Sequence, residues 1–141
     1  MVTFRRSVDI ACPPEQVFAV YADVERWPEW TASVTVVERL DHGPLGVGAR
    51  TRVRQPRLPV AEWVVTELEP GRVFSWEAKG PGVRTTGRHR VEARPGGCRV
   101  TAELVQGGLL GPVVALLTGG LTRRYLDLEV AGIKQRCERS P

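Results

Sequence analysis

Few side chains in this sequence are suited to chemistry, and His89 is the most distinctive of them. It is the only histidine within a predicted strand, residues 83–93. An imidazole exchanges protons near neutral pH, so His89 is a candidate general base for an aldol-type cyclisation, which begins by removing an acidic proton beside a carbonyl. The alternative is a histidine that only forms a hydrogen bond in a partly polar interior.

The other charged side chains of the strands point elsewhere. Strand alternation places Arg84, Arg88 and Arg90 opposite to His89. The carboxylate alternatives Glu62, Glu77 and Glu103 are expected on the wet face of a sheet. The spacings of a nucleophile elbow, a zinc protease, a dinucleotide site or a P-loop are absent from the sequence. We therefore expect no cofactor and no metal, and only proton-transfer chemistry such as cyclisation, dehydration or isomerisation.

The cysteines are three and widely spaced, which does not suit a disulfide framework or a zinc site. We predict that Cys12, Cys98 and Cys137 are buried or incidental thiols.

Most of the chain is predicted to form short strands that must position these groups. After a first strand at residues 2–11, Pro13 and Pro14 start a short helix, and a second helical turn is expected at 24–30. Turn signals rich in Gly and Pro then separate six further strands at 34–40, 47–55, 60–69, 72–79, 83–93 and 99–106. Such spacing indicates an antiparallel sheet of hairpins.

The long segment 109–136 is predicted to be one major helix. Its expected apolar face is formed by Val113, Leu117, Leu121, Leu128 and Ile133, with Leu116 and Tyr125 beside it. Charged residues, including Asp127 and Glu129, are expected to fill the remaining surface. Gly119 and Gly120 interrupt this segment, and glycine costs about 1 kcal/mol against alanine inside a helix. They indicate either a kink or two helices in series, or else space beside the helix for a ligand.

Two further patterns leave alternatives open. Trp27 and Trp30 flank Pro28, and these rings either cover the core or line the mouth of a cavity. The period-two row Arg50, Arg52 and Arg54 marks either a solvated outer face or a surface for an anionic partner such as RNA.

Length and charge limit the possible classes of protein. The 141 residues predict one domain, spanning 1–141, and the net charge of +4 contains no long run of like charges. We do not expect nucleic acid as a partner. The start of the sequence does not look like a leader, and no apolar run reaches about 18 residues, so we expect a cytoplasmic protein without a membrane partner. We expect the protein to be either a monomer or a homodimer.

This order of elements resembles the helix-grip fold of the START-like (SRPBCC) superfamily, in its bacterial polyketide cyclase/dehydrase-like branch. The likeness is carried by Pro14-Glu15-x-Val17-Phe18, by Asp23-Val24-Glu25-Arg26-Trp27-Pro28-Glu29-Trp30, by Gly46-Val47-Gly48 and by Glu69-Pro70-Gly71-Arg72. The resemblance implies an α+β fold, in which a curved antiparallel sheet wraps around a long C-terminal helix, with two short helices after the first strand.

The resemblance also implies a ligand between the concave sheet face and the long helix. The inward-pointing candidates are Trp30, Gln55, Trp76, His89 and Tyr125. The alternation of its strand does not decide whether Trp63 points inward or outward. The expected function is binding of a small, mainly hydrophobic or aromatic molecule. The alternatives are a cofactor-independent cyclase or dehydratase using His89, and an interaction module with a basic outer face.

Overall fold

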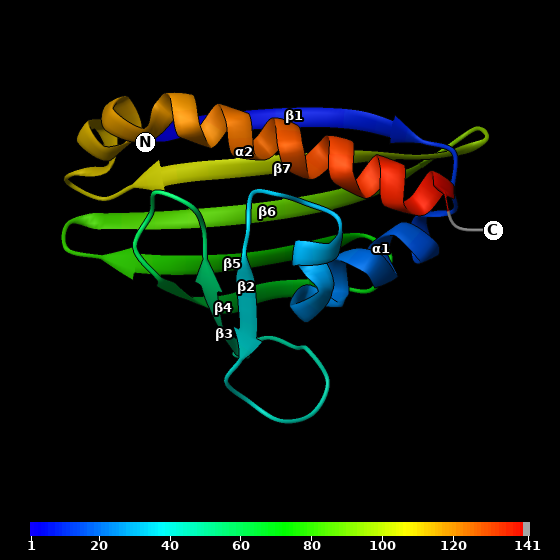
Figure 1. Ribbon diagram of the computed structural model, residues 1–141, viewed down its shortest axis with the longest axis horizontal. Helices are drawn as coiled ribbons and strands as arrows, with labels where there is room; N and C mark the ends of the chain where they lie inside the picture. The colour runs from blue at the N-terminus through cyan, green and yellow to red at the C-terminus, as the bar shows by residue number, and fades with distance from the viewer. Residues whose placement is uncertain (140–141) are drawn as a thin grey trace.

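The computed structural model describes residues 1–139, which form one antiparallel sheet and three helical segments (Figure 1). The strands are β1 (Val2–Ile10), β2 (Val36–Arg39), β3 (Arg50–Arg54), β4 (Ala61–Glu69), β5 (Val73–Gly80), β6 (Val83–Arg94) and β7 (Gly97–Gly107). The helical segments are α1 (Pro14–Ala22), the 3-10 helix η1 (Val24–Glu29) and α2 (Gly111–Arg139). The helix-grip fold expected from the sequence is confirmed.

The seven strands lie in the order β1-β7-β6-β5-β4-β3-β2. Every neighbouring pair is antiparallel, so consecutive strands from β2 to β7 form hairpins and β1 closes the far edge against β7. A register shift between Val65 and Glu67 marks a bulge in β4, which helps the sheet to curve. One face of this curved sheet is concave and receives the helices.

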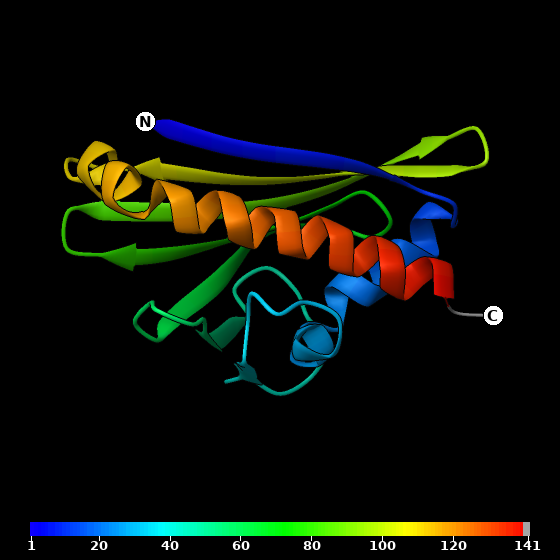
Figure 2. The same ribbon diagram turned by 45° about the horizontal axis from the view of Figure 1, so that its top comes forward.

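Helix α2 crosses the concave face over β1 and β7, as both views show (Figure 2). Its C-terminal half lies beside α1 and η1, whereas its N-terminal end lies beside the β5–β6 hairpin. Gly108 has a φ of +88°, and a side chain there would meet the Gly82 carbonyl, so glycine suits the turn that leads into α2. The amide of Leu110 donates to the same carbonyl at 2.7 Å, which ties the start of α2 to the hairpin.

The apolar face of α2 differs from the expected one in its first half. Val113, Leu116 and Leu117 are exposed, and the sheet is met instead by Gly111, Ala115 and Gly119. Of the alternatives for Gly119 and Gly120, two helices in series is wrong, because α2 is continuous. The space beside Gly119 is taken by the ring of Phe4 from β1. Small residues therefore let α2 approach the sheet closely at this end.

The core divides into two clusters along α2. The larger contains all four tryptophans together with Tyr21, Phe74 and Ile133, under α1, η1 and the second half of α2. The smaller contains Phe4, Ala102, Ala115, Leu126 and Val130, between α2 and the β1–β7 edge. The large aromatic side chains thus occupy one end of the concave face, and that end is the one closed by the short helices.

Candidate functional site

Three of the predicted site residues, Trp30, Trp76 and His89, belong to one sealed cluster of rings. Trp27 joins them: its ring centroid lies 5.4 Å from Trp30, 5.2 Å from Trp76 and 5.3 Å from His89. All four side chains are buried. Trp30 therefore lies in the core, where its Nε1 has no hydrogen-bond partner among residues 1–139.

The alternation of β4 left the direction of Trp63 open, and the structure settles it. The side chain points to the concave face and packs against Trp76, with ring centroids 5.5 Å apart.

The polar contacts of His89 lie inside this cluster. Its Nδ1 is 3.0 Å from the carbonyl oxygen of Phe74, and because a carbonyl only accepts, Nδ1 is the donor. Its Nε2 faces Glu129 Oε2 at 3.5 Å. The hydroxyl of Tyr21 donates to the same Glu129 oxygen at 3.2 Å. Burial, and after it the Glu129 carboxylate, raises the pKa of Tyr21 well above its ordinary value, so the phenol keeps its proton.

These contacts bear on the general-base hypothesis. His89 is only 4% exposed, and both of its ring nitrogens face protein groups. A substrate proton could reach the imidazole only if the surrounding rings moved apart. The imidazole is held by one hydrogen bond, to the Phe74 carbonyl, and faces the Glu129 carboxylate in a partly polar interior.

Glu129 is the buried polar residue that sequence reasoning misplaced. It was expected on the surface of α2, yet it is 8% exposed and joins Tyr21 to His89. The signal was present in its spacing, because Glu129 follows Leu126 by three residues and precedes Ile133 by four. Both of those neighbours are buried, so Glu129 falls on the inner face of the helix.

The other two predicted site residues, Gln55 and Tyr125, lie together at a different place. Gln55 follows β3 directly and its Nε2 donates to the Ser33 carbonyl at 3.2 Å. The hydroxyl of Tyr125 donates to the carbonyl of Pro56, the residue after Gln55. Both side chains are half-buried. Tyr125 therefore ties α2 to the loop between β3 and β4.

Beyond this contact, the concave face is less completely covered. Ala78, Thr85 and Leu104 have the same strand parity as the buried Trp76, His89 and Ala102, so they point to the inner face, yet each is only partly buried. Thr85 donates to the Gln106 side chain at 2.8 Å, which places one polar pair among apolar neighbours. We call the region of Ala78, Thr85 and Leu104, with the buried side chain of Gln106 beside Thr85, the open end of the concave face.

Helix α2 borders the open end. Thr118, Leu121 and Tyr125 follow one another at spacings of three and four, so they share a side of the helix. Tyr125 reaches the β3–β4 loop, and all three residues are half-buried. A mostly apolar wall with a few hydroxyl and amide groups is typical of a small-molecule site.

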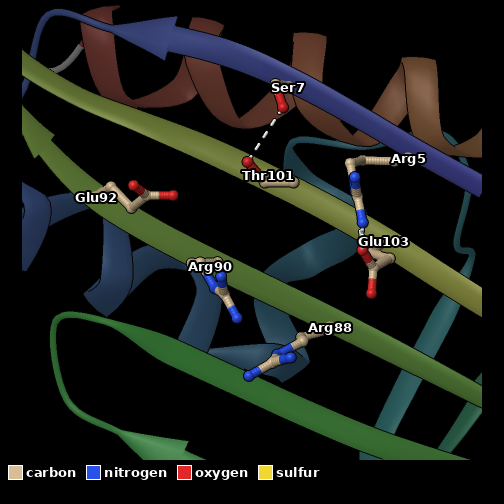
Figure 3. Close-up of a pocket in the computed structure, with 7 residues that line it drawn as sticks. All are labelled: Arg5, Ser7, Arg88, Arg90, Glu92, Thr101 and Glu103. Atoms are coloured by element: carbon tan, nitrogen blue, oxygen red, sulfur yellow. Dashed lines mark hydrogen bonds and ion pairs between the residues drawn. The ribbon is translucent and has the colours of Figure 1, made fainter.

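The outer face of the sheet contains a separate hollow of about 350 Å³ (Figure 3). It is lined by Arg5, Ser7, Arg88, Arg90, Glu92, Thr101 and Glu103. Charges of both signs meet here, with Arg5 bound to Glu103 at 2.6 Å and the hydroxyls of Ser7 and Thr101 3.1 Å apart.

The arginine row of β3 also lies on the outer face. Arg50 pairs with Asp41 and Arg52 with Glu38, each at 3.1 Å. These pairs favour the solvated-face interpretation over a surface for an anionic partner.

The cysteine prediction is confirmed, since Cys12, Cys98 and Cys137 are buried free thiols. Among residues 1–139, no three side chains of the metal-ligating types are grouped so as to hold an ion. Within the same residues, no helix combines the length and the apolar character that crossing a bilayer requires.

The fold and its partly covered concave face define a helix-grip protein, and comparison with known proteins gives the family. A family model described as polyketide cyclase / dehydrase and lipid transport matches residues 1–138. The protein Rv2574 of Mycobacterium tuberculosis is 34% identical over 113 residues, which cover 77% of this chain and 67% of that protein. The chain therefore belongs to the polyketide cyclase/dehydrase-like family of the SRPBCC superfamily.

Solved structures agree on the fold. The ZhuI aromatase/cyclase of Streptomyces sp. R1128 superposes with a TM-score of 0.74 at 18% identity, covering 98% of this chain and 94% of that one. TTHA0849 of Thermus thermophilus superposes with a TM-score of 0.76, also at 18% identity, covering 96% and 97%. At such identity the likeness concerns the fold, and any shared activity is a separate matter.

Proposed function

We propose that this protein binds a small, mainly apolar molecule at the open end of the concave face. The observation that carries the proposal is the contrast along one face of the sheet. Phe74, His89 and Val100 are sealed at one end, whereas Ala78, Thr85 and Leu104 are only partly buried at the other. Leaving apolar inner-face surface uncovered loses burial free energy, about 25 cal/mol per Å², which a bound apolar molecule would recover.

The neighbouring side chains suggest how such a molecule would be held. The Thr85–Gln106 pair and the Tyr125 hydroxyl supply polar contacts, while Leu104 and Ala78 supply apolar ones. The indole of Trp76 covers Gly87, two residues along β6 from Thr85. A ring bound at the open end would therefore lie near the tryptophan cluster, and an aromatic ligand would quench its fluorescence.

The test is tryptophan quenching with a panel of naphthalene- and anthraquinone-type phenols, compared between two matched variants. Thr85 and Thr86 are adjacent on β6 and both half-buried, but they lie on opposite faces of the sheet. Thr85→Phe should fill the open end and weaken binding at least about tenfold, the effect of losing about 1.4 kcal/mol. Thr86→Phe should leave binding unchanged.

A control separates steric filling from loss of a hydrogen bond. Thr85→Val keeps the size of the side chain but removes the donor to Gln106. Binding that is saturable in the wild type, retained in Thr85→Val and Thr86→Phe, and lost in Thr85→Phe would support the site. Equal loss in Thr85→Phe and Thr86→Phe, or no quenching by any compound, would refute it.

For His89 we propose a structural role in the ring cluster. The imidazole joins the β5 backbone to Glu129 of α2, and its ring stacks on Phe74 with centroids 5.1 Å apart. His89→Gln should therefore lower the free energy of unfolding while leaving the affinity for a quenching ligand close to that of the wild type. Turnover of a cyclisable substrate that disappeared in a folded His89→Gln protein would instead establish the general-base role.

A further inference from the structure

The first part of α2 and the turn just before it carry a group of exposed aliphatic side chains that the site does not use. We call it the α2-tip patch and define it as Leu109, Leu110, Val113, Leu116 and Leu117. Their exposed fractions are 91%, 45%, 53%, 84% and 78%. Single exposed leucines are ordinary, but five large aliphatic residues within nine positions form a contiguous patch, and such patches mark interaction surfaces.

The patch follows from how α2 meets the sheet. Its inner face here consists of Gly111, Ala115 and Gly119, which already contact the strands, so the large residues have no place on the inside. The start of the helix is also fixed in position, because the Leu110 amide donates to the Gly82 carbonyl. The start of α2 therefore has a defined position beside the β5–β6 hairpin (Figure 1).

The charges around the patch favour an anionic partner. Residues 107–126 contain no aspartate or glutamate, and their only charges are Arg123 and Arg124. Val113, Leu117 and Arg124 follow one another at spacings of four and seven, so they lie on one stripe of the helix. At 1.5 Å per residue, Arg124 is about 10 Å further along the axis than Leu117. The helix thus has apolar side chains at its tip and arginines one to two turns further along. A bilayer surface has the matching order, with acyl chains inside and phosphates outside them.

We propose that the α2-tip patch docks on the surface of an anionic phospholipid bilayer, with Leu116 and Leu117 entering the interface and Arg124 contacting phosphates. The expectation of no membrane partner rested on the lack of a spanning segment, which does not bear on a peripheral contact. A second copy of this chain fits less well, because the patch offers no carboxylate to pair with the arginines of a copy. Docking goes beyond ligand binding, and neither requires the other.

The test is co-sedimentation of the whole protein with vesicles of phosphatidylcholine mixed with phosphatidylglycerol, and with vesicles of phosphatidylcholine alone. Wild-type protein should sediment with the anionic vesicles and dissociate as salt is added. Leu116→Glu combined with Leu117→Glu should weaken binding at least about tenfold, since two apolar side chains are lost from the interface. Arg124→Gln should weaken it about fivefold.

A matched control comes from Val47, an aliphatic residue that is 70% exposed but lies in the loop between β2 and β3. Val47→Glu should bind vesicles as the wild type does. Circular dichroism establishes that every variant is folded, and all substituted positions are solvent-exposed. Native mass spectrometry of each protein reports its oligomeric state in parallel.

Three results would overturn the proposal. The first is no sedimentation with anionic vesicles. The second is sedimentation that the Leu116→Glu, Leu117→Glu protein retains, because binding would then come from charge elsewhere on the molecule. The third is a wild-type dimer that these two substitutions dissociate, which would assign the patch to a second copy.

Discussion

Alanine substitutions at three glycines of α2 should change the free energy of unfolding in opposite directions, because the space around each glycine differs. At Gly120 an added Cβ would meet no atom within 4 Å, so the substitution gains only helix propensity. The expected gain in the free energy of unfolding is about 1 kcal/mol, and part of it arises because alanine restricts the unfolded chain more than glycine does. For a chain of this size the gain corresponds to a rise in Tm of about 4 °C. At Gly132 an added Cβ would overlap the carbonyl oxygen of Trp30.

The overlap at Gly132 cannot be relieved by rotating a side chain, because the obstructing atom belongs to the backbone. Forcing α2 and η1 apart should cost about 1–3 kcal/mol, as overpacking does elsewhere. At Gly119 the atom nearest to an added Cβ would be a guanidinium nitrogen of Arg123, at 3.3 Å, and this flexible side chain can move aside. We expect Gly119→Ala to behave like Gly120→Ala.

Urea unfolding followed by tryptophan fluorescence measures all three variants under the same conditions. The expected free energy of unfolding is higher than that of the wild type for Gly120→Ala and Gly119→Ala, and lower for Gly132→Ala. If Gly132→Ala were as stable as Gly120→Ala, the close approach of α2 to Trp30 would be refuted, and with it the packing that holds Trp30 in the ring cluster.

Three further predictions concern buried and paired groups. Glu129→Ala leaves the buried Tyr21 hydroxyl without its acceptor. In a double-mutant cycle measured by urea unfolding, this substitution should lower the free energy of unfolding by about 1–3 kcal/mol more in the wild type than in Tyr21→Phe. The hydrogen bond from Arg99 lowers the pKa of Asp9 in the folded protein, so the unfolded chain takes up the proton first. The stability contributed by this pair is therefore present above the ordinary carboxyl pKa of about 4, and it is lost as the pH falls through the lower pKa of Asp9 in the folded protein. Asp9→Asn should remove that part of the pH dependence of urea unfolding. Burial raises the pKa of the Cys137 thiol to about 11, so mass spectrometry should find slow alkylation by iodoacetamide in the native protein and rapid alkylation in urea.

The fold was predictable because its signals are local and mutually consistent. The Gly and Pro turns divided the chain into the strands that the structure contains, and strand alternation placed Trp76 and His89 on the inner face. Alternation also placed Arg88 and Arg90 on the outer face, where they line the hollow. These predictions depend only on the period of two of a strand, which the sheet preserves along most of its length.

The candidate site was harder to predict because inward direction does not determine access. His89, Trp30 and Tyr125 were all expected to line one cavity, yet the first two are sealed by Trp27 and Tyr21. Which inner-face residues are covered depends on where α1 and η1 lie over the sheet, and that is a tertiary property. No spacing in the sequence reports it, so the open end at Thr85 could not be distinguished from the sealed end at His89.

Helix α2 shows why hydrophobicity alone misplaced its buried face. In its second half the rule holds, because Leu126, Val130 and Ile133 fill the space between helix and sheet. In its first half the helix approaches the sheet through Gly111, Ala115 and Gly119, and close approach excludes larger side chains. The leucines are then turned outward, at the same end where the inner face is incompletely covered. A helix that packs through small residues thus leaves its large apolar residues exposed. The positions of glycine and alanine, more than those of leucine, indicate which side of such a helix faces the core.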